Sequence, residues 1–475
     1  MADRPIIQPR VLSGFRDWLP QPAFLRETML GKIQQVFRAH GFWPIETPVL
    51  EYADILTGKG GEESDRILYR FKDHGERDVA LRFDLTVPLA RYVAQHLNEV
   101  GLPFRRYHIG RVYRGERPGK GRFREFTQCD CDLLGPSGAN AAAADVEILL
   151  TLADALAALD VGPITYKLNH RGILNALLRR LGVAEHAAHV LRSLDKFQKI
   201  GREKVRDELQ FGAHDSPGHP DDPGETKTVF MSADQADRIL DMVTMPDETG
   251  DAERIERLGE LVNEDEAGRA ALSDLAQTVE SCRRHFPAGV AVRFDPLLAR
   301  GLDYYTGIVF EAVLDAQPDQ GSISGGGRYD NLTNAFSKRS IPGVGGSIGI
   351  DRLIDGVVEA TLAKQAAGGA GTTGGPIGPA PVLVVQFEAR FLTQYFDMAT
   401  TLRRAGIGCE LFADKANLKA QLGYADTHGF RLAVIAGETE IAAGTVNLRN
   451  LATREQITVK REDLVAAVRK LLGPA

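Results

Sequence analysis

A stretch rich in glycine and proline near the end of the chain most constrains how this sequence can fold. Nine of the fourteen residues from Gly368 to Pro381 are Gly or Pro, and such a segment cannot bury enough apolar area to order itself. The strand-like runs VLVVQF, IGCELF and RLAVIAG follow it and alternate with helical stretches. The sequence therefore predicts a linker over residues 367–381 and a small three-layer α/β domain with a largely parallel sheet over residues 382–475.

Length and composition limit what the whole chain can be. A chain of 475 residues suggests about three domains, and 43% hydrophobic with 25% charged residues is ordinary for a soluble protein. No apolar run approaches the roughly 20 residues that cross a bilayer, and the opening MADRPIIQPR is neither a signal core nor a transit helix. We therefore expect a cytoplasmic protein with no membrane partner. The net charge of −7 argues against indiscriminate nucleic-acid binding but leaves room for a local basic patch.

The cysteines indicate neither a disulfide scaffold nor a metal site. The four of them, Cys129, Cys131, Cys282 and Cys409, are few and scattered. The one close pair has CxC rather than CxxC spacing. We assign no metal site.

Hydrophobic periodicity divides the chain before the linker into three parts. Residues 1–168 combine an N-terminal helix, the extended stretch GFWPIETPVLE, an antiparallel hairpin over 104–134 with the basic tip ERPGKG, and a further helix. Residues 169–290 are helical and look inserted, with a polar loop at 214–225. Strands resume over residues 291–366, where GVGGSIGIDRLIDGVVEATL turns a glycine-rich strand into a helix.

The second strand of the hairpin carries a polar face. Side chains two residues apart share a face of a strand. The polar face holds Arg124, Phe126, Gln128, Asp130 and Asp132, and the opposite, core-like face holds Phe123, Thr127, Cys129 and Cys131. On the first strand, Arg114 shares a face with Val112 and His108.

The hairpin is strongly basic. Eight Lys or Arg lie between Arg105 and Arg124, against one acidic residue, Glu116. The guanidinium fork matches phosphate oxygens, so this field suits a nucleoside triphosphate, an RNA end, or both. The alternative is an ordinary solvated sheet face.

The octapeptide RGLDYYTG, from Arg300 to Gly307, places a cation, a carboxylate and two phenols close together. Such a cluster suits an anionic substrate. The apolar runs DPLLA and IVFEAVL flank it, so Arg300 is expected where the backbone enters a strand. An exposed Arg at a strand end is the alternative.

Two further segments allow two interpretations each. In LRFDLTVPLARY, Asp84 and Thr86 end a strand before a helix, and Asp84 either caps that helix or binds a ligand ammonium. GGGRYDNL, from Gly325 to Leu332, is expected to join a strand to a helix and to bring backbone close to a small ligand. Glycine runs are also ordinary turns.

Together these strings resemble the histidyl-tRNA synthetases, a family of class II aminoacyl-tRNA synthetases, in the right order over nearly the whole chain. HGFWPIETPVLE resembles class II motif 1, a dimer-interface element. RVYRGERPGKGRFREFTQCDCDLLG resembles motif 2, and GVGGSIGIDRL resembles motif 3. RGLDYYTG and GGGRYD are similar to two peptides peculiar to the histidine enzymes.

The resemblance implies an α+β catalytic domain with a six-stranded antiparallel sheet, a helical insertion and a C-terminal α/β anticodon-binding domain. It implies the domains 1–168 and 291–366 (catalytic core), 169–290 (insertion), 367–381 (linker) and 382–475 (anticodon binding). It also implies a homodimer. The implied partners are L-histidine, ATP with Mg²⁺ as its counter-ion, and tRNA(His).

The resemblance also implies roles for individual residues. Arg114 would hold the ATP α-phosphate with help from Arg124, Phe126 would stack on adenine, Glu116 would sit near the adenine amino group, and Arg352 would stack or contact the far phosphates. The implied histidine-binding residues are Asp84, Leu85, Thr86, Arg114, Gln128, Asp132, Arg300, Tyr304 and Tyr305. Arg300 and Arg114 would be catalytic, with Arg300 neutralising the reacting carboxylate and α-phosphate.

The implied reaction forms histidyl-adenylate from histidine and ATP and then transfers the histidyl group to the 3′ end of tRNA(His), releasing AMP. The alternative is a catalytically silent histidine-sensing regulatory subunit of ATP phosphoribosyltransferase. Such paralogues usually lack the C-terminal domain and parts of RGLDYYTG, both of which this chain retains. The chain departs from many bacterial members by carrying Asp84 and Asp132 where those have Glu.

Overall fold

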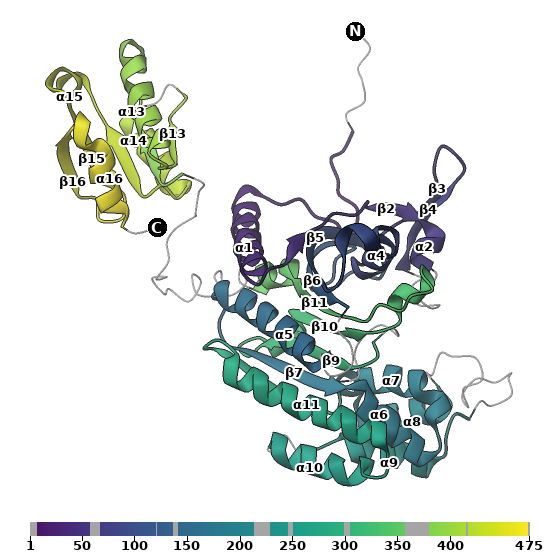
Figure 1. Ribbon diagram of the computed structural model, residues 1–475. Helices are drawn as coiled ribbons and strands as arrows, with labels where there is room; N and C mark the ends of the chain where they lie inside the picture. The colour runs from purple at the N-terminus through teal and green to yellow at the C-terminus, as the bar shows by residue number, and fades with distance from the viewer. Residues whose placement is uncertain are drawn as a thin grey trace. The chain divides into compact units, whose positions relative to one another are not determined.

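The structure is a computed structural model that describes residues 7–57, 67–119, 121–135, 141–212, 229–245, 250–298, 305–356, 380–414 and 417–473. The chain divides into two compact units, Met1–Asp17 with Met29–Val357, and Trp18–Thr28 with Val358–Ala475 (Figure 1). Three sequence predictions lie wholly or mostly outside the described residues: the polar loop at 214–225, the linker up to residue 379, and the roles of Arg300 and Tyr304.

An eight-stranded sheet forms the centre of the first unit. Its strands lie in the order β1-β5-β6-β11-β10-β9-β7-β8. The six central strands are antiparallel to their neighbours, whereas β1 pairs parallel to β5 and β8 pairs parallel to β7. The expected six-stranded antiparallel sheet is therefore present, with one parallel strand added at each edge. The strands are β1 (Trp43–Pro44), β5 (Phe104–Tyr113), β6 (Glu125–Leu134), β7 (Ile164–His170), β8 (Val290–Phe294), β9 (Ile308–Leu314), β10 (Ser324–Tyr329) and β11 (Gly343–Gly349).

One face of this sheet is covered by two long helices, α5 (Ala141–Ala158) and α11 (Glu266–His285), which run along it (Figure 1). The apolar side of β6 faces α5: Cys131 lies opposite Gly346, and a Cβ on Gly346 would lie 2.7 Å from the Leu152 side chain of α5. Cys129 and Cys131 are fully buried there. This is the core face that the alternation predicts. The other helices around the sheet are α1 (Pro20–Ala39) and α4 (Thr86–Val100), and β2 (Leu50–Tyr52), β3 (Tyr69–Lys72) and β4 (Asp78–Leu81) form a small second sheet beside α2 (Ala53–Thr57).

The helical stretch in the middle of the chain belongs to the first unit. Four of its helices share an apolar core that includes Leu178, Val205 and Leu240, all fully buried. The stretch differs at its ends from the predicted span, since residues 169 and 170 complete β7 and residue 290 begins β8. Its helices are α6 (Arg171–Leu181), α7 (Ala187–Asp195), α8 (Phe197–Phe211), α9 (Ala233–Val243), α10 (Asp251–Val262) and α11.

The prediction that GGGRYDNL joins a strand to a helix is wrong, because its glycines form the interior of β10. A short 3₁₀ helix, Leu332–Ala335, follows instead. A Cβ on Gly326 would lie 2.2 Å from the Gly345 carbonyl oxygen and 2.7 Å from the Phe310 ring. The glycines are therefore required for space between neighbouring strands rather than for a turn.

The second unit contains a five-stranded sheet in the order β13-β12-β14-β15-β16. Val382 and Val384 of β12 belong to one buried cluster and Leu383 and Val385 to another, so helices cover both faces, as the predicted three layers require. The sheet is mixed rather than largely parallel, because β14–β15 and β15–β16 pair antiparallel. Its elements are β12 (Val382–Val384), α13 (Leu392–Arg404), β13 (Cys409–Leu411), α14 (Leu418–Thr427), β14 (Leu432–Ile435), α15 (Glu438–Ala443), β15 (Thr445–Asn450), β16 (Gln456–Lys460) and α16 (Leu464–Leu472).

Within the described ranges, no helix has the length and apolar character needed to cross a membrane.

We predict that Gly326→Ala lowers the free energy of unfolding by at least about 2 kcal/mol, since the methyl group would overlap neighbouring backbone in the sheet. Gly325→Ala is the matched control on the same strand, because its Cβ would come no closer than 3.4 Å to any neighbour. Urea unfolding followed by circular dichroism measures both variants. Equal stability of the two would contradict the close-packing explanation.

Candidate functional site

The sheet face opposite α5 and α11 carries rows of polar side chains. Residues directly opposite each other in antiparallel strands point to the same face. Asp132 lies opposite Arg106 on one side and Gly345 on the other, and Gly345 lies opposite Gly327. A second row joins His108, Asp130, Ser347 and Gly325. Glycines in β10 and β11 thus leave room beside the charged side chains of β5 and β6.

These polar groups are buried, so the solvated-face alternative is wrong for this part of β6. Asp130 and Asp132 are each 3% exposed and Arg106 is 0% exposed. An Arg106 Nη2 atom lies 2.6 Å from Asp132 Oδ2, and the Tyr329 hydroxyl donates to Asp132 Oδ1. A buried charged cluster of this kind is costly unless a ligand or a partner charge compensates it.

Burial raises the pKa of the carboxyl groups in this cluster. The Asp130 carboxyl has its pKa raised from the ordinary 3.8 to about 7, with Arg106 acting in the opposite direction. The Asp132 carboxyl also has a raised pKa, for the same reason and again opposed by Arg106. Burial lowers the pKa of the His108 imidazole to about 3, and Arg106 and Arg82 add to that effect. His108 is therefore neutral near pH 7.

Asp84 accepts a hydrogen bond at the start of α4, and its carboxylate also has a second buried oxygen. Its Oδ1 accepts a hydrogen bond from the Val87 backbone N–H at 3.1 Å, in the first turn of α4. Its Oδ2 is buried and accepts no hydrogen bond from the described residues, and burial raises the pKa of the carboxyl to about 6. Thr86 is half-buried, whereas the Leu85 side chain is 0% exposed. Only the backbone of Leu85 could therefore reach a ligand.

Arg114 lies next to Phe126 at the end of the hairpin. The guanidinium carbon is 5.1 Å from the centre of the Phe126 ring, and Nε donates to the Phe83 carbonyl at 3.0 Å. The nearby Gln128 has a buried Oε1 that accepts no hydrogen bond within the described ranges. A cation, an aromatic ring and an amide oxygen thus lie close together at the start of β6.

Arg124 and Glu116 lie further towards the tip. Arg124 Nε donates to the Glu116 carbonyl at 3.0 Å, and Arg124 Nη1 donates to the Ser13 carbonyl at 3.3 Å. The Glu116 side chain is exposed. These bonds hold the N-terminal segment against the hairpin.

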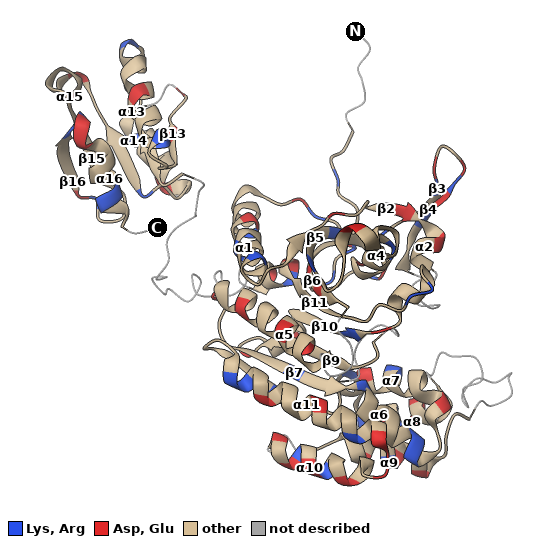
Figure 2. Ribbon diagram, in the orientation of Figure 1, with Lys and Arg blue, Asp and Glu red and all other residues tan. Residues whose placement is uncertain are grey.

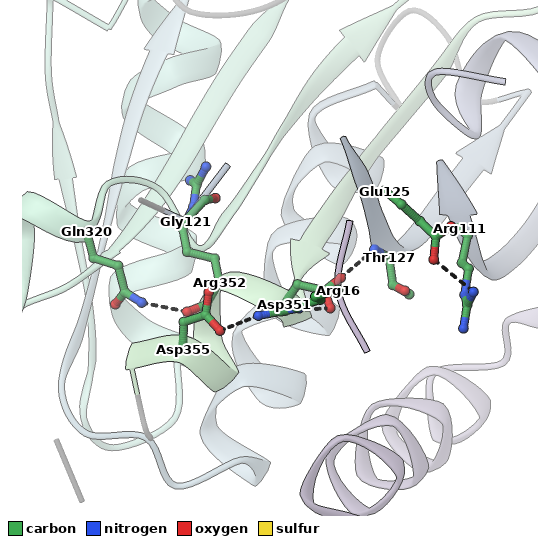
Figure 3. A network of polar contacts seen from close by, with 9 residues as sticks. All are labelled: Arg16, Arg111, Gly121, Glu125, Thr127, Gln320, Asp351, Arg352 and Asp355. Carbon is green, nitrogen blue, oxygen red and sulfur yellow. Dashed lines mark hydrogen bonds and ion pairs between the residues drawn. The ribbon is translucent and has the colours of Figure 1, made fainter. Parts of the chain in front are cut away.

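Figure 3 shows the network that anchors Arg352. Arg352 Nε lies 3.4 Å from the Gly121 carbonyl oxygen, its Nη1 donates to the Ser322 carbonyl, and its own carbonyl accepts from Gln320. The preceding residue, Asp351, accepts from the Thr127 backbone N–H of β6. The helical residues 350–356 are therefore tied to both the hairpin and the loop before β10.

Arg16 from the N-terminal segment completes this network. It donates to Asp355 at 2.6 Å and to Asp351 at 3.1 Å (Figure 3). Its guanidinium carbon also lies 3.9 Å from the centre of the Phe123 ring. Two carboxylates and an aromatic ring fix one guanidinium beside the site.

Of RGLDYYTG, the structure describes Tyr305, Thr306 and Gly307. A Cβ on Gly327 would lie 2.8 Å from the Tyr305 ring, and Tyr305 packs against the cluster of Ala90, Tyr329 and Leu332. The structure thereby brings Asp84, Arg114, Gln128, Asp132 and Tyr305 together with the unpredicted Arg106 and Tyr329. Arg300 and Tyr304 are outside the described residues.

Arg106 and Tyr329 were not predicted as site residues from the sequence, and Asp130 was placed on the polar face but not in the site. Arg106 and His108 alternate with the core residue Tyr107, which is the same signal that identified the polar face of the second strand. Pairing the hairpin with a fixed register would have placed Arg106 opposite Asp132. Tyr329 follows the glycines of β10, and nothing in the sequence showed that its hydroxyl reaches β6.

Basic residues of the helical stretch are largely matched by acidic ones. Acidic and basic residues lie close together along α10 and α11 (Figure 2). Arg283 pairs with Asp251 at 2.7 Å, and Arg206 pairs with Asp237 at 2.7 Å. In the described portion of the chain, no group of three or more His, Cys, Asp or Glu side chains could hold a metal ion.

Known proteins are similar to this chain over nearly its whole length. The family description "Histidyl-tRNA synthetase" matches residues 14–353, and "Anticodon binding domain" matches residues 381–471. The chain is 42% identical over 451 residues to a histidine–tRNA ligase of Rhodopirellula baltica, covering 95% of each chain. It is 40% identical over 462 residues to one of Wolinella succinogenes, covering 96% of this chain and 97% of the relative.

Solved structures extend the comparison to the fold. The histidyl-tRNA synthetase from Nostoc sp. PCC 7120 matches with a TM-score of 0.81 at 31% identity, covering 98% of this chain and 100% of that chain. An ATP phosphoribosyltransferase regulatory subunit/histidyl-tRNA synthetase from Bacillus halodurans C shares the fold at 23% identity, with a TM-score of 0.68, covering 89% of this chain and 97% of that chain. The expected fold class is confirmed: an α+β catalytic domain with a largely antiparallel sheet and a C-terminal α/β anticodon-binding domain.

We predict that Asp351→Ala lowers the free energy of unfolding by roughly 2–4 kcal/mol, because it removes the acceptor of the buried Thr127 backbone N–H and one of the two carboxylates that bind Arg16. Asp355→Ala is the matched control, since that side chain is 29% exposed and binds the same Arg16. It should cost about 1 kcal/mol or less. Denaturant unfolding measures both, and equal losses would contradict the role given to Asp351.

We predict that Asp84→Asn stabilises the protein above pH 6. The folded-state pKa of about 6 lies above the ordinary 3.8, so ionisation of Asp84 costs stability progressively as pH rises from about 4 to 6. The gain should reach at most roughly 3 kcal/mol at pH 8 and shrink towards zero near pH 4. Asp78→Asn, at an exposed carboxyl whose pKa Arg70 lowers, should show no such gain. Urea unfolding between pH 4.5 and 8 tests this, and a gain independent of pH would refute it.

Proposed function

This chain belongs to the histidyl-tRNA synthetase family, and we propose an assignment of its site residues to the two steps of histidine–tRNA ligation. The enzyme activates L-histidine with ATP to histidyl-adenylate and then transfers the histidyl group to the 3′ end of tRNA(His), releasing AMP. The match to an anticodon-binding domain favours this ligase over the regulatory-subunit alternative.

The nucleotide is proposed to lie over the hairpin. Arg114 would hold the α-phosphate and Phe126 would stack on adenine, which their 5.1 Å separation supports. Arg352 would cover the nucleotide from the other side, because its bonds to the Gly121 and Ser322 carbonyls hold it beside the hairpin tip. Arg124 would assist with the phosphates, and the exposed Glu116 would meet the adenine amino group.

Histidine is proposed to bind at the buried carboxylates. Asp84 would accept from the ammonium group through its Oδ2, to which no described group donates, together with Thr86 and the Leu85 backbone. The remaining contacts are proposed for Gln128, Asp132, Tyr304 and Tyr305, which would enclose the imidazole and the amino acid. The single observation that carries the assignment is that buried oxygen atoms of Asp84, Asp130 and Gln128 lack a hydrogen-bond donor among the described residues.

The same feature explains how other amino acids would be rejected. A pocket whose acceptors are aimed at imidazole N–H groups leaves those acceptors unpaired when an apolar side chain enters. A buried polar group without a partner costs about 1–3 kcal/mol. Discrimination of this kind needs no separate editing domain.

The chemistry of adenylate formation concentrates negative charge. The reacting carboxylate and the α-phosphate of ATP approach each other, and fixed guanidinium groups stabilise the crowded charge without having to reorganise. We assign this task to Arg114 and Arg300. The in-line transfer requires mainly positioning and charge stabilisation.

Mg²⁺ is proposed as the counter-ion of the outer phosphates. Magnesium usually keeps several waters and binds through substrate phosphates with one or two carboxylates. The described residues offer no larger cluster of ligands, which fits an ion carried by the nucleotide rather than one held in a protein cage. Bound there, it would neutralise the pyrophosphate leaving group.

We also propose a homodimer, formed through the motif 1 region. Exposed apolar side chains gather in and near this segment, including Trp43 at 71%, Tyr52 at 53% and Leu50 at 40% exposure. The edge strand β1 also pairs on one side only among the described strands. The proposed domains remain 1–168 with 291–366, 169–290, 367–381 and 382–475, and the last would bind the tRNA(His) anticodon. Because translation is cytoplasmic, we infer that location for the enzyme.

We predict histidine-dependent exchange between ATP and pyrophosphate, and no exchange with the other nineteen amino acids. Arg300→Ala should reduce histidine-dependent exchange by about 10²–10³-fold with little change in melting temperature, because Arg300 is assigned to the transition state. Arg111→Ala is the control, since Arg111 is exposed and pairs with Glu125 at 2.8 Å. A purified protein that binds histidine but shows no exchange would support the regulatory-subunit alternative, and a large fall in melting temperature would give Arg300 a structural role.

A further inference from the structure

Arg106 is a buried cation to which the proposed assignment gives no task. It lies in β5, is 0% exposed, and faces Asp132 at 2.6 Å. Among the described residues, its guanidinium forms this ion pair and its nitrogens make no further hydrogen bond. A fully buried guanidinium has five N–H donors to satisfy, so this arrangement is costly for a residue that only supports the fold.

Another buried arginine nearby shows what structural support looks like. Arg82 is 3% exposed, and its guanidinium donates to the backbone carbonyls of Thr47 at 2.7 Å and Arg111 at 2.9 Å. These bonds join three segments of backbone. Arg106 makes no such bond in the described part of the chain, and its close contact is a carboxylate of the proposed histidine pocket.

Three carboxylates depend on the charge of Arg106. It opposes the effect of burial on Asp84, Asp130 and Asp132, and for Asp130 and Asp132 it is the largest opposing influence. The negative charge of Asp132 raises the pKa of Asp130, because two carboxylates close together repel each other. The titratable and charged groups around them are His108 and Arg106 from β5, Arg82 from the end of β4, Asp84 and Arg114 from the adjoining segments, and Tyr329 from β10.

The protonation state of these carboxyls decides whether histidine can bind. The ammonium group of histidine and the N–H of its imidazole are donors. An ionised carboxylate only accepts, whereas a protonated carboxyl presents a donor to the ligand. In a site this dry, burial alone would favour the protonated form.

We propose that Arg106 is a positioning residue for histidine recognition: its guanidinium is the counter-charge that holds Asp132 as an acceptor for the substrate, while Asp130 draws on the same charge. The inference rests on the proposed function, because it concerns the same histidine pocket. Arg106 acts through the carboxylates and need not touch the substrate. Removing Arg106 and removing Asp130 must then have opposite effects on the pocket.

The test compares Arg106→Met, Asp130→Asn and Arg105→Met with the unaltered enzyme. Arg105 is the matched control, since it neighbours Arg106 on β5, points to the other face and pairs with Glu147 at 2.6 Å. Histidine-dependent exchange is measured from pH 6 to 9, giving KM for histidine and for ATP at each pH. Titration of free histidine is common to all variants, so differences between them report the protein.

Arg106→Met is expected to raise the histidine KM at pH 7 by about tenfold or more, while the ATP KM changes by less than about threefold. The acid limb of kcat/KM for histidine should move up by about one pH unit, because loss of a nearby opposite charge raises carboxyl pKa values. Affinity should therefore recover at high pH. Asp130→Asn should move the same limb to lower pH, and Arg105→Met should move it in neither direction.

Several results would overturn the inference. One is a folded Arg106→Met enzyme with an unchanged histidine KM, or with histidine and ATP KM raised equally. Another is an Asp130→Asn enzyme whose acid limb stays in place or moves up, and this variant decides the question if circular dichroism shows that Arg106→Met does not fold. Absence of exchange in the unaltered enzyme would instead refute the proposed function. If the unaltered enzyme and Arg105→Met both show normal exchange, an unchanged histidine KM in Arg106→Met counts against the role of Arg106 and not against the proposed function.

Discussion

The antiparallel register that joins β5, β6, β11 and β10 is the constraint on which the site depends. It sets Asp132 opposite Arg106 on one side and opposite Gly345 on the other. A slip of one residue would turn Asp130 and Asp132 towards α5 and bring Cys129 and Cys131 to the site face. Apolar packing on the helix-covered face therefore fixes the positions of the charges on the opposite face.

Burying these charged groups lowers the stability of the folded protein. Burial raises the pKa of Asp84, Asp130 and Asp132, so each carboxylate destabilises the fold when it ionises. Proteins retain such costs at sites where a ligand supplies the missing partner. The histidine substrate of this family carries cationic and N–H groups suited to these acceptors, so one feature reduces stability and provides selectivity.

The second anchor of the site is far away in sequence. Arg16 binds Asp351 and Asp355, and Asp351 accepts from the backbone of β6 (Figure 3). The N-terminal segment, the hairpin and the helical residues 350–356 are held together by a few charge-assisted bonds. Arg352 is thereby fixed beside the hairpin tip, where the nucleotide is proposed to bind.

Local patterns in the sequence determined much of this protein. Alternation in β6 identified both the core face with Cys129 and the polar face with Gln128 and Asp132, because side-chain period in a strand is a local property. Motif strings identified the family. The glycines of β10 were expected where a strand joins a helix, but they lie inside the strand, because Gly345 and Phe310 on neighbouring strands leave no room for a side chain at Gly326. The sheet of the second unit was predicted to be largely parallel, because β15 and β16 were not recognised as strands in the sequence. Their antiparallel pairing is a long-range property that the local pattern does not report.

What only the tertiary structure decided is how buried charges meet. Arg106 reaches Asp132 from the first strand of the same hairpin. Tyr329 reaches it from a strand 197 residues further along the chain, and no local pattern reports that meeting. Sequence spacing specifies which face of a strand a side chain takes. Burial, partner charges and the resulting protonation state depend on which other segments pack against that face, and these are properties of the folded chain alone.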